Sequence, residues 1–164
     1  MKKAPNSARA HISLGFEYES KGLRDKGIEQ YLIGLNLKPN LATARYDLGN
    51  AYLAKGLMDK AIEQYRLAIN LKPDFIIAHY NLGLALSRKG IWDQAMEQYL
   101  IVIKSDPERA GAHENLGVAY AEKGLADKAI EHFKIALTLN PQDQTYRDNL
   151  ANAYQMRKSG GKMK

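Results

Sequence analysis

The sequence predicts an all-α protein, a solenoid of stacked helical hairpins, and two periodic features indicate this fold. All five prolines, Pro5, Pro39, Pro73, Pro107 and Pro141, are spaced 34 residues apart. Glycine recurs with the same period, at Gly15, Gly49, Gly83 and Gly117 and again at Gly22, Gly56, Gly90 and Gly124. A fixed period of this length is the signature of a repeat array, in which each unit stacks on its neighbours and a continuous core forms between them.

The period divides the chain into four repeats with a shorter segment at each end. We expect residues 1–7 to form a lead-in, residues 8–41, 42–75, 76–109 and 110–143 to form the repeats, residues 144–158 to form a capping helix, and residues 159–164 to form a disordered tail. The capping segment restarts the pattern with Tyr146, Leu150 and Tyr154 and then stops, so we expect it to cover the apolar face of the last hairpin. The lead-in is in register with the end of an earlier repeat, which favours a fragment of a longer array.

Each repeat predicts a helix, a short turn and a second helix. The first helix carries apolar residues at helical spacing and ends in lysine followed by glycine, which suits a helix C-terminus. Three residues after the glycine stands an aspartate that we expect to cap the second helix: Asp25, Asp59, Asp93 or Asp127. Proline then ends the second helix. The predicted caps of the following first helices are Asn6, Asn40 and Asp74.

Small residues mark the seam of each predicted hairpin. Glycine at position 8 of the repeat faces an aromatic residue at position 24, which is Tyr31, Tyr65, Tyr99 or Phe133. The missing side chain lets the two helices approach closely. The first repeat has two further seam glycines, Gly27 and Gly34, where the other repeats have alanine or valine. Because glycine inside a helix costs about 1 kcal/mol relative to alanine, we expect this repeat to be the least stable.

This pattern resembles the tetratricopeptide repeat. In the second repeat the resemblance is carried by Leu48, Gly49, Tyr52, Ala61, Tyr65 and Pro73, and the other repeats follow the same plan. One position departs from it, because the residue that is often tryptophan in the family is His11, Arg45, His79 or His113 here. The resemblance implies a right-handed α-solenoid superhelix of helix–turn–helix hairpins that binds proteins and is not an enzyme.

The net charge of +6 does not predict a nucleic-acid partner. Six cations lie in the terminal segments, and the 18 basic residues that remain balance 18 acidic ones. There is no cysteine, which excludes disulfides and cysteine-based metal sites. The longest uncharged apolar stretch, residues 75–87, is too short and too polar to span a bilayer, and the N-terminus lacks the apolar core of a signal peptide. We therefore expect no membrane insertion and, by default, a cytoplasmic location.

No group of residues forms a catalytic or cofactor-binding constellation, so the sequence predicts neither an enzyme nor a cofactor. His11, His79 and His113 recur, but equivalent positions of stacked repeats lie about 10 Å apart, which is too far for one metal ion to bridge. We interpret them as partly buried packing residues. His132 replaces a glutamine of the other repeats, and we expect it on a solvated helix face.

The resemblance also implies a concave groove lined by the first helices, with positions 2, 5, 6, 9, 12 and 13 of each repeat pointing into it. The predicted groove residues are Ile12, Phe16, Tyr46, Asn50, Leu53, Ile77, Tyr80, Asn81, Leu84, Arg88, Glu114, Asn115, Val118 and Asn149. Four charged residues, Arg9, Glu19, Asp47 and Glu122, also occupy these positions. Asparagine recurs at position 6, and Asp47 precedes the series. This is similar to the asparagine ladder of O-GlcNAc transferase, and amides of this kind can pair with the backbone of an extended peptide. The alternative is that they bond only within the array.

A second family binding mode fits poorly. Co-chaperone repeats hold the terminal carboxylate of a chaperone with three cations and two asparagines. Asn50 and Asn81 occupy the two asparagine positions, but Tyr46, Gly111 and Asn115 stand where the cations are required. A charged C-terminus is therefore not the expected ligand.

The sequence thus predicts a scaffold that binds a peptide or helical segment of a protein partner. Two alternatives remain open. One is a self-association module that stacks through its uncapped first repeat. The other is a substrate-docking region of a larger enzyme, because the run PNSARAHISLG is similar to repeat regions attached to bacterial membrane glycosyltransferases.

Overall fold

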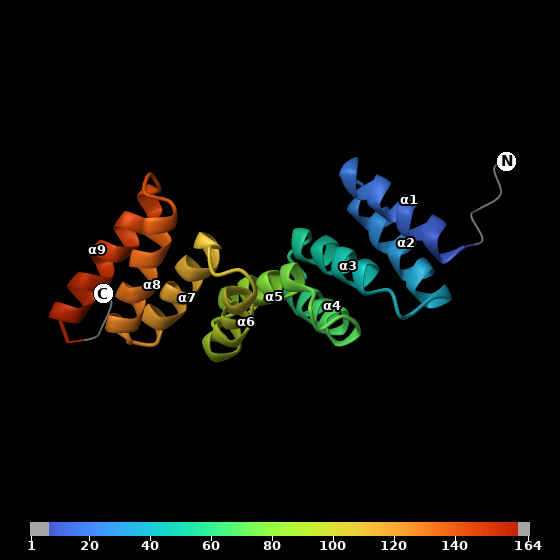
Figure 1. The fold of residues 1–164 in the computed structure, drawn as a ribbon. Helices are drawn as coiled ribbons and strands as arrows, with labels where there is room; N and C mark the ends of the chain where they lie inside the picture. The colour runs from blue at the N-terminus through green and yellow to red at the C-terminus, as the bar shows by residue number, and fades with distance from the viewer. Residues whose placement is uncertain (1–6, 161–164) are drawn as a thin grey trace. The chain divides into compact units, whose positions relative to one another are not determined.

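The computed structural model describes residues 7–160, and these residues form nine α-helices and no strand (Figure 1). The helices are α1 (Ala8–Ser20), α2 (Arg24–Leu37), α3 (Ala42–Ala54), α4 (Met58–Leu71), α5 (Ile76–Arg88), α6 (Trp92–Ser105), α7 (Ala110–Glu122), α8 (Ala126–Leu139) and α9 (Gln144–Lys158). The predicted all-α helical repeat fold is confirmed. Nearly all of the predicted lead-in and most of the predicted disordered tail lie outside the described residues.

The helices belong to two compact units. Unit 1 ends at Ala78 and unit 2 begins at His79, so α1 to α4 belong to the first unit and α6 to α9 to the second. Within unit 1, α1 packs against α2, α2 against α3 and α3 against α4. Within unit 2, α7 lies between α6 and α8, and α9 packs against α8. Contact between neighbours along the chain is the pattern of a repeat array.

A glycine-centred turn joins the two helices of each hairpin. Gly22, Gly56, Gly90 and Gly124 have φ between 70° and 77°, the left-handed region that favours glycine. In the first turn, the N–H of Gly22 donates to the carbonyl of Glu19 at 2.9 Å, and the N–H of Leu23 donates to the carbonyl of Tyr18 at 2.8 Å. These are the two bonds of a Schellman motif, and the same pair closes the other three turns.

The predicted aspartate caps of the second helices are wrong, because the turn is too short for them. The N-cap of each second helix is the residue directly after the glycine, and its side chain makes no capping hydrogen bond. These N-caps are Leu23, Leu57, Ile91 and Leu125. The aspartates lie instead in the first helical turn, where a carboxylate interacts favourably with the helix dipole. Asp25 pairs with Lys55, Asp93 with Lys123 at 2.5 Å, and Asp127 with Arg157 at 3.5 Å.

The N-caps of α1 and α3 each lie one residue after the predicted capping residue. Leu41 rather than Asn40 is the N-cap of α3, and it makes no side-chain bond. The hydroxyl of Ser7 accepts a hydrogen bond from the N–H of Ala10 at 3.2 Å and so caps α1. The predicted cap Asn6 lies outside the described residues.

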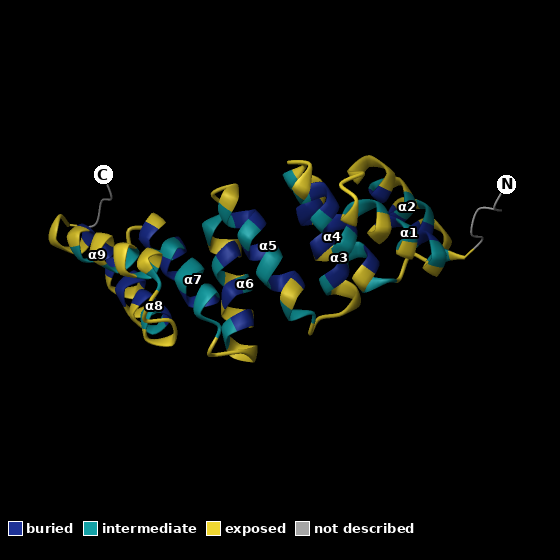
Figure 2. Ribbon diagram, turned by 90° about the horizontal axis from the view of Figure 1, so that it is seen from above, coloured by how far each residue is buried: buried dark blue, intermediate teal, exposed yellow. Residues whose placement is uncertain are grey.

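The seam glycines bring an aromatic ring directly against the first helix. A Cβ added to Gly15 would lie 2.7 Å from Cδ1 of Tyr31, and one added to Gly83 would lie 2.6 Å from Cε1 of Tyr99. The four aromatic side chains at position 24 are at most 2% exposed. Figure 2 shows buried residues along the paired helices and exposed residues at the turns. The predicted structural role of these positions is confirmed.

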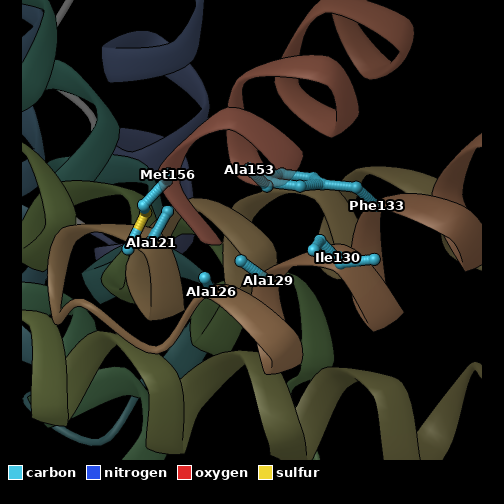
Figure 3. Packing of buried hydrophobic residues seen from close by; sticks show 7 residues of the cluster. All are labelled: Ala121, Ala126, Ala129, Ile130, Phe133, Ala153 and Met156. Carbon is cyan, nitrogen blue, oxygen red and sulfur yellow. The ribbon is translucent and has the colours of Figure 1, made fainter. Parts of the chain in front are cut away.

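Helix α9 covers the apolar side of the last hairpin. Ala153 and Met156 of α9 belong to one buried cluster with Ala121 of α7 and with Ile130 and Phe133 of α8 (Figure 3). This is the packing expected of a capping helix.

Candidate functional site

The predicted groove residues lie on the first helices and on α9, and they are divided between the two units. Unit 1 holds Ile12, Phe16, Tyr46, Asn50, Leu53 and Ile77, and unit 2 holds Tyr80, Asn81, Leu84, Arg88, Glu114, Asn115, Val118 and Asn149. Most of these side chains are half-buried, whereas Phe16, Ile77 and Arg88 are exposed. Each unit therefore presents a candidate binding face of its own.

Tyr80 is held on the unit 2 face by contacts with three side chains. The guanidinium of Arg109 lies over its ring, 4.3 Å from the centroid. Nδ2 of Asn115 donates a hydrogen bond to its hydroxyl at 3.0 Å, and the ring of Tyr99 lies edge-on with a centroid distance of 6.2 Å. A cation over an aromatic ring is attracted to it by about 0.5–2 kcal/mol. The Tyr80 ring is thus ordered by the unit itself.

Asn115 uses both of its amide hydrogens inside the unit. Nδ2 donates to the hydroxyl of Tyr80 and to the carbonyl of Gly111 at 2.7 Å. An asparagine side chain has two N–H donors and one carbonyl acceptor. Among the described residues nothing donates to Oδ1 of Asn115. This amide therefore offers a ligand an acceptor but no donor.

Asn149 is bonded within the array as well. Its Nδ2 donates to Oε1 of Glu114 at 3.1 Å, so an amide of α9 meets a carboxylate of α7. Burial raises the pKa of Glu114, the negative charge of Asp143 raises it further, and the bond from Asn149 opposes both effects. At two of the recurring asparagines, Asn115 and Asn149, the side-chain amide therefore donates to groups within the array.

Aromatic rings form the candidate face of unit 1. The ring of Tyr46 on α3 lies 5.2 Å from that of Phe75 and 5.9 Å from that of Tyr65, centroid to centroid. The hydroxyl of Tyr65 donates to Oδ1 of Asn50 at 2.7 Å, which ties this asparagine to the hairpin seam. Phe16 on α1 is 65% exposed, more than any other large apolar side chain of the described residues. The face is thus aromatic, with amide support.

Arg109 is a residue of the unit 2 site that sequence analysis missed. It precedes α7 as its N-cap, so it is not at one of the family's groove positions. The equivalent residues of the two preceding repeats are Leu41 and Phe75. The signal was therefore a cation at a position that is apolar in the two preceding repeats.

The recurring histidines are buried seam residues, as expected. His11, His79 and His113 are at most 8% exposed. Nδ1 of His11 and Nδ1 of His79 each lie 2.8 Å from Oε1 of a glutamine on the second helix, Gln30 and Gln98. These side-chain pairs satisfy polar groups that the seam encloses.

His132 is half-buried, so its predicted solvated position is wrong. Its Nδ1 lies 3.0 Å from Nδ1 of His113, and its ring lies 5.5 Å from that of Tyr120. Nε2 of His113 lies 3.0 Å from the carbonyl oxygen of Pro107, so this nitrogen carries the proton and Nδ1 of His113 accepts from His132. Burial lowers the pKa of His132, and His113 lowers it further. The prediction failed because this helix position faces the seam.

Two further observations concern the described part of the chain. It contains no group of three or more histidine, cysteine, aspartate or glutamate side chains arranged to hold a metal ion. None of the helices in this part combines the length and the apolar character needed to cross a bilayer.

Comparisons with known proteins agree with the repeat pattern. A "TPR repeat" model matches residues 49–90, and a "Tetratricopeptide repeat" model matches residues 77–144. Among curated proteins there is no significant match.

Solved structures show the same arrangement of helices. A crystal structure of MamA is 33% identical, covers 86% of this chain and 82% of its own, and superposes with a TM-score of 0.81. MamA from Desulfovibrio magneticus RS-1, from residue 41 to its end, is 19% identical, covers 94% of this chain and 93% of its own, and has a TM-score of 0.83. PilF from Pseudomonas aeruginosa is 24% identical, covers 92% of this chain and 69% of its own, and has a TM-score of 0.76. The last two likenesses concern the fold alone.

Proposed function

Because the chain belongs to the tetratricopeptide repeat family, whose repeats generally serve as non-catalytic scaffolds for protein–protein interaction, we propose that its first helices bind a peptide or helical segment of a partner protein. The proposed contact residues are Ile12, Phe16, Tyr46, Asn50, Leu53, Ile77, Tyr80, Asn81, Leu84, Arg88, Glu114, Asn115, Val118 and Asn149. One observation carries the proposal: Tyr80 is a half-buried aromatic side chain that Arg109 and Asn115 hold in place.

An ordered tyrosine suits an interface anchor for two reasons. Tyrosine is enriched among the residues that dominate interface energies. A side chain that is already ordered loses little conformational entropy when a partner binds. Leu84 follows Tyr80 by one helical turn on α5, and Val118 follows Glu114 by one turn on α7, so each pair shares a helix face. The half-buried apolar side chains of Leu84 and Val118 extend the proposed contact beyond the tyrosine.

We propose that Asn115 acts toward the partner as a hydrogen-bond acceptor and not as a donor. Both hydrogens of Nδ2 are donated within unit 2, which leaves Oδ1 to accept a hydrogen bond. A backbone N–H of an extended partner segment is a donor of the required kind. The partner therefore donates at this position, and an N-methylated peptide bond placed there should weaken binding.

Peptides selected from a random display library on the wild-type protein provide the test. Tyr80→Ala and Leu84→Ala should each weaken binding by about 1 kcal/mol or more, which is about fivefold in Kd, without changing the helical circular dichroism. Leu100→Ala is the matched control, since Leu100 is 46% exposed but lies on the second helix α6. If both first-helix variants bind the selected peptides as tightly as the wild type, the face is wrongly assigned.

One observation favours a second function, self-association. Phe16 exposes 65% of its surface on α1 in the first repeat. An exposed aromatic side chain of this size offers a contact for a second copy of the chain. Sedimentation equilibrium over a range of concentrations tests this, and Phe16→Ser should abolish any dimer. A wild-type protein that is monomeric at every concentration would contradict this second function.

A further inference from the structure

Tyr31 is an exception among the seam aromatics. Tyr65 and Tyr99 each hydrogen-bond a side chain of the first helix in their own hairpin, at 2.7 Å and 3.0 Å, and Phe133 has no hydroxyl. Tyr31 is 1% exposed, yet among the described residues its hydroxyl has no hydrogen-bond partner. The hydroxyl oxygen is not among the fully buried unpaired atoms of the described residues. A group that approaches from outside can therefore bond to it.

Two carboxylates, one on α1 and one on α3, act electrostatically on this hydroxyl. Burial raises the pKa of Tyr31, and the negative charges of Asp47 and then Glu19 raise it further. Oε1 of Glu19 lies 2.9 Å from the Cβ position of Gly27, which precedes Tyr31 by one turn of α2. That oxygen is buried and has no hydrogen-bond partner among the described residues. Within the same residues Asp47 has none either.

Among the described residues no cation forms an ion pair with either carboxylate. Arg24 on α2 lowers the pKa of Glu19, but the larger effect is burial, which raises it. Burial also raises the pKa of Asp47 to about 6. In the described residues neither carboxylate takes part in an ion pair. When both carboxylates are ionised, the cluster offers two charged acceptors and one neutral hydroxyl.

We propose that Glu19, Tyr31 and Asp47 form a binding site for an alkylammonium group, and that this group belongs to a lysine side chain of the partner segment. An ammonium has three N–H donors and no acceptor, so it can bond to all three side chains and neutralise the carboxylates at once. A calcium ion fits less well, because it requires six to eight oxygen ligands. Glu19 and Asp47 occupy family groove positions, so this inference rests on the proposed function.

The acidic character of this cluster is a departure from the repeat. The equivalents of Glu19 are Leu53, Ser87 and Ala121, and those of Asp47 are Asn81, Asn115 and Asn149. At these two positions the first hairpin therefore has two carboxylates beside its seam aromatic, and the other three hairpins have none. Asp47→Asn and Tyr31→Phe introduce residue types that other repeats already hold at these positions, so both variants are expected to fold.

The site is tested first with a small amine. Nα-acetyl-lysine N-methylamide is titrated into the full chain, and the side-chain carboxyl ¹³C signals of Glu19 and Asp47 are followed by NMR. We expect saturable shifts, a lower pKa of Asp47 in the presence of the amine, and binding weakened about tenfold by Asp47→Asn. Glu29→Gln, at an exposed acid of α2, is the control and should leave binding unchanged. Equal shifts with the norleucine analogue, or none with lysine, would overturn the site.

The lysine assignment is tested with two peptide libraries that differ only in a fixed central residue, lysine or norleucine. The wild type should retain the lysine library several-fold better, and Asp47→Asn should abolish that preference while its retention of the norleucine library stays unchanged. Equal retention of both libraries would overturn the lysine inference and leave the proposed function standing. If neither library is retained, the proposed function fails and the lysine assignment fails with it. Binding of the small amine without a lysine preference would assign the site to free amines.

Discussion

Replacing Gly117 by alanine tests the close contact on which the hairpin seams depend. The added Cβ would lie 2.7 Å from Cε1, 2.8 Å from Cδ1 and 3.1 Å from Cζ of Phe133. The ring is 2% exposed and belongs to a buried cluster with Ala153 and Met156 of α9. Because side chains enclose it, the ring cannot move aside without displacing the cap.

Two opposing effects decide the outcome. Alanine stabilises a helix interior by about 1 kcal/mol relative to glycine. Overpacking a well-filled core costs about 1–3 kcal/mol. At Gly117 the clash involves three atoms of a buried ring rather than the mobile end of a flexible side chain. The clash should therefore prevail, and we expect Gly117→Ala to lower the free energy of unfolding by about 1 kcal/mol.

Urea unfolding followed by circular dichroism measures this change, and hydrogen exchange of the α7 and α8 amides locates it, since a repeat array need not unfold in one step. In a Phe133→Leu background the ring is absent, so the alanine should cost less and the double-mutant cycle should show a coupling energy above about 0.5 kcal/mol. Gly111→Ala in the same helix is the control, because its Cβ would approach the hydroxyl end of Tyr80, at 2.9 Å. If Gly117→Ala instead stabilises the protein by the full helix-propensity gain, the seam is not tightly packed and the reasoning fails.

Three further predictions concern stability and charge. Residues 8–41 should exchange their backbone amides faster than residues 42–109, because the first repeat has two additional helical glycines; uniform protection in hydrogen-exchange mass spectrometry would contradict this. Any binding of duplex DNA at low salt should disappear when residues 1–4 and 157–164 are removed, since the remaining charges balance, and tight binding by the trimmed chain at physiological salt would refute it. Stability should fall as the pH drops below 6.5, because burial and a neighbouring histidine lower the pKa of His132 and the unfolded chain takes up the proton first. Thermal unfolding of His132→Gln should show a smaller loss between pH 7 and pH 5, and an unchanged slope would count against this pair as the cause.

The period predicted the fold because it fixes the few positions that a hairpin cannot vary. Gly15 and Tyr31 illustrate this, because a side chain at Gly15 would clash with the ring of Tyr31. The capping residues could not be predicted in the same way. An aspartate near a helix start satisfies the local preference equally well as a cap or in the first turn, and only the Schellman turn, with its exact residue count, decides between the two.

The partners of the site residues were harder to predict than the residues themselves. Asn115 bonds to Tyr80 and Asn149 bonds to Glu114, and both pairs are 35 residues apart. This separation is one repeat plus one residue, so it follows from how two first helices lie side by side and not from the composition of either repeat. The sequence therefore indicated which side chains occupy the face, whereas the geometry of neighbouring repeats determines which of their donors and acceptors remain for a partner.

The residues that break the repeat pattern carry most of the chemistry proposed for this chain. A residue that recurs in every repeat is required by the seam or the turn, and its chemistry is used there. Asp47 stands where two later repeats and the capping helix have asparagine, and Arg109 stands where two earlier repeats have apolar residues, so the fold requires neither charge. Burial raises the pKa of Asp47 to about 6, which means that keeping this carboxylate charged in the folded chain costs free energy. A charge that the fold does not need and that lowers stability is better explained by a ligand that neutralises it.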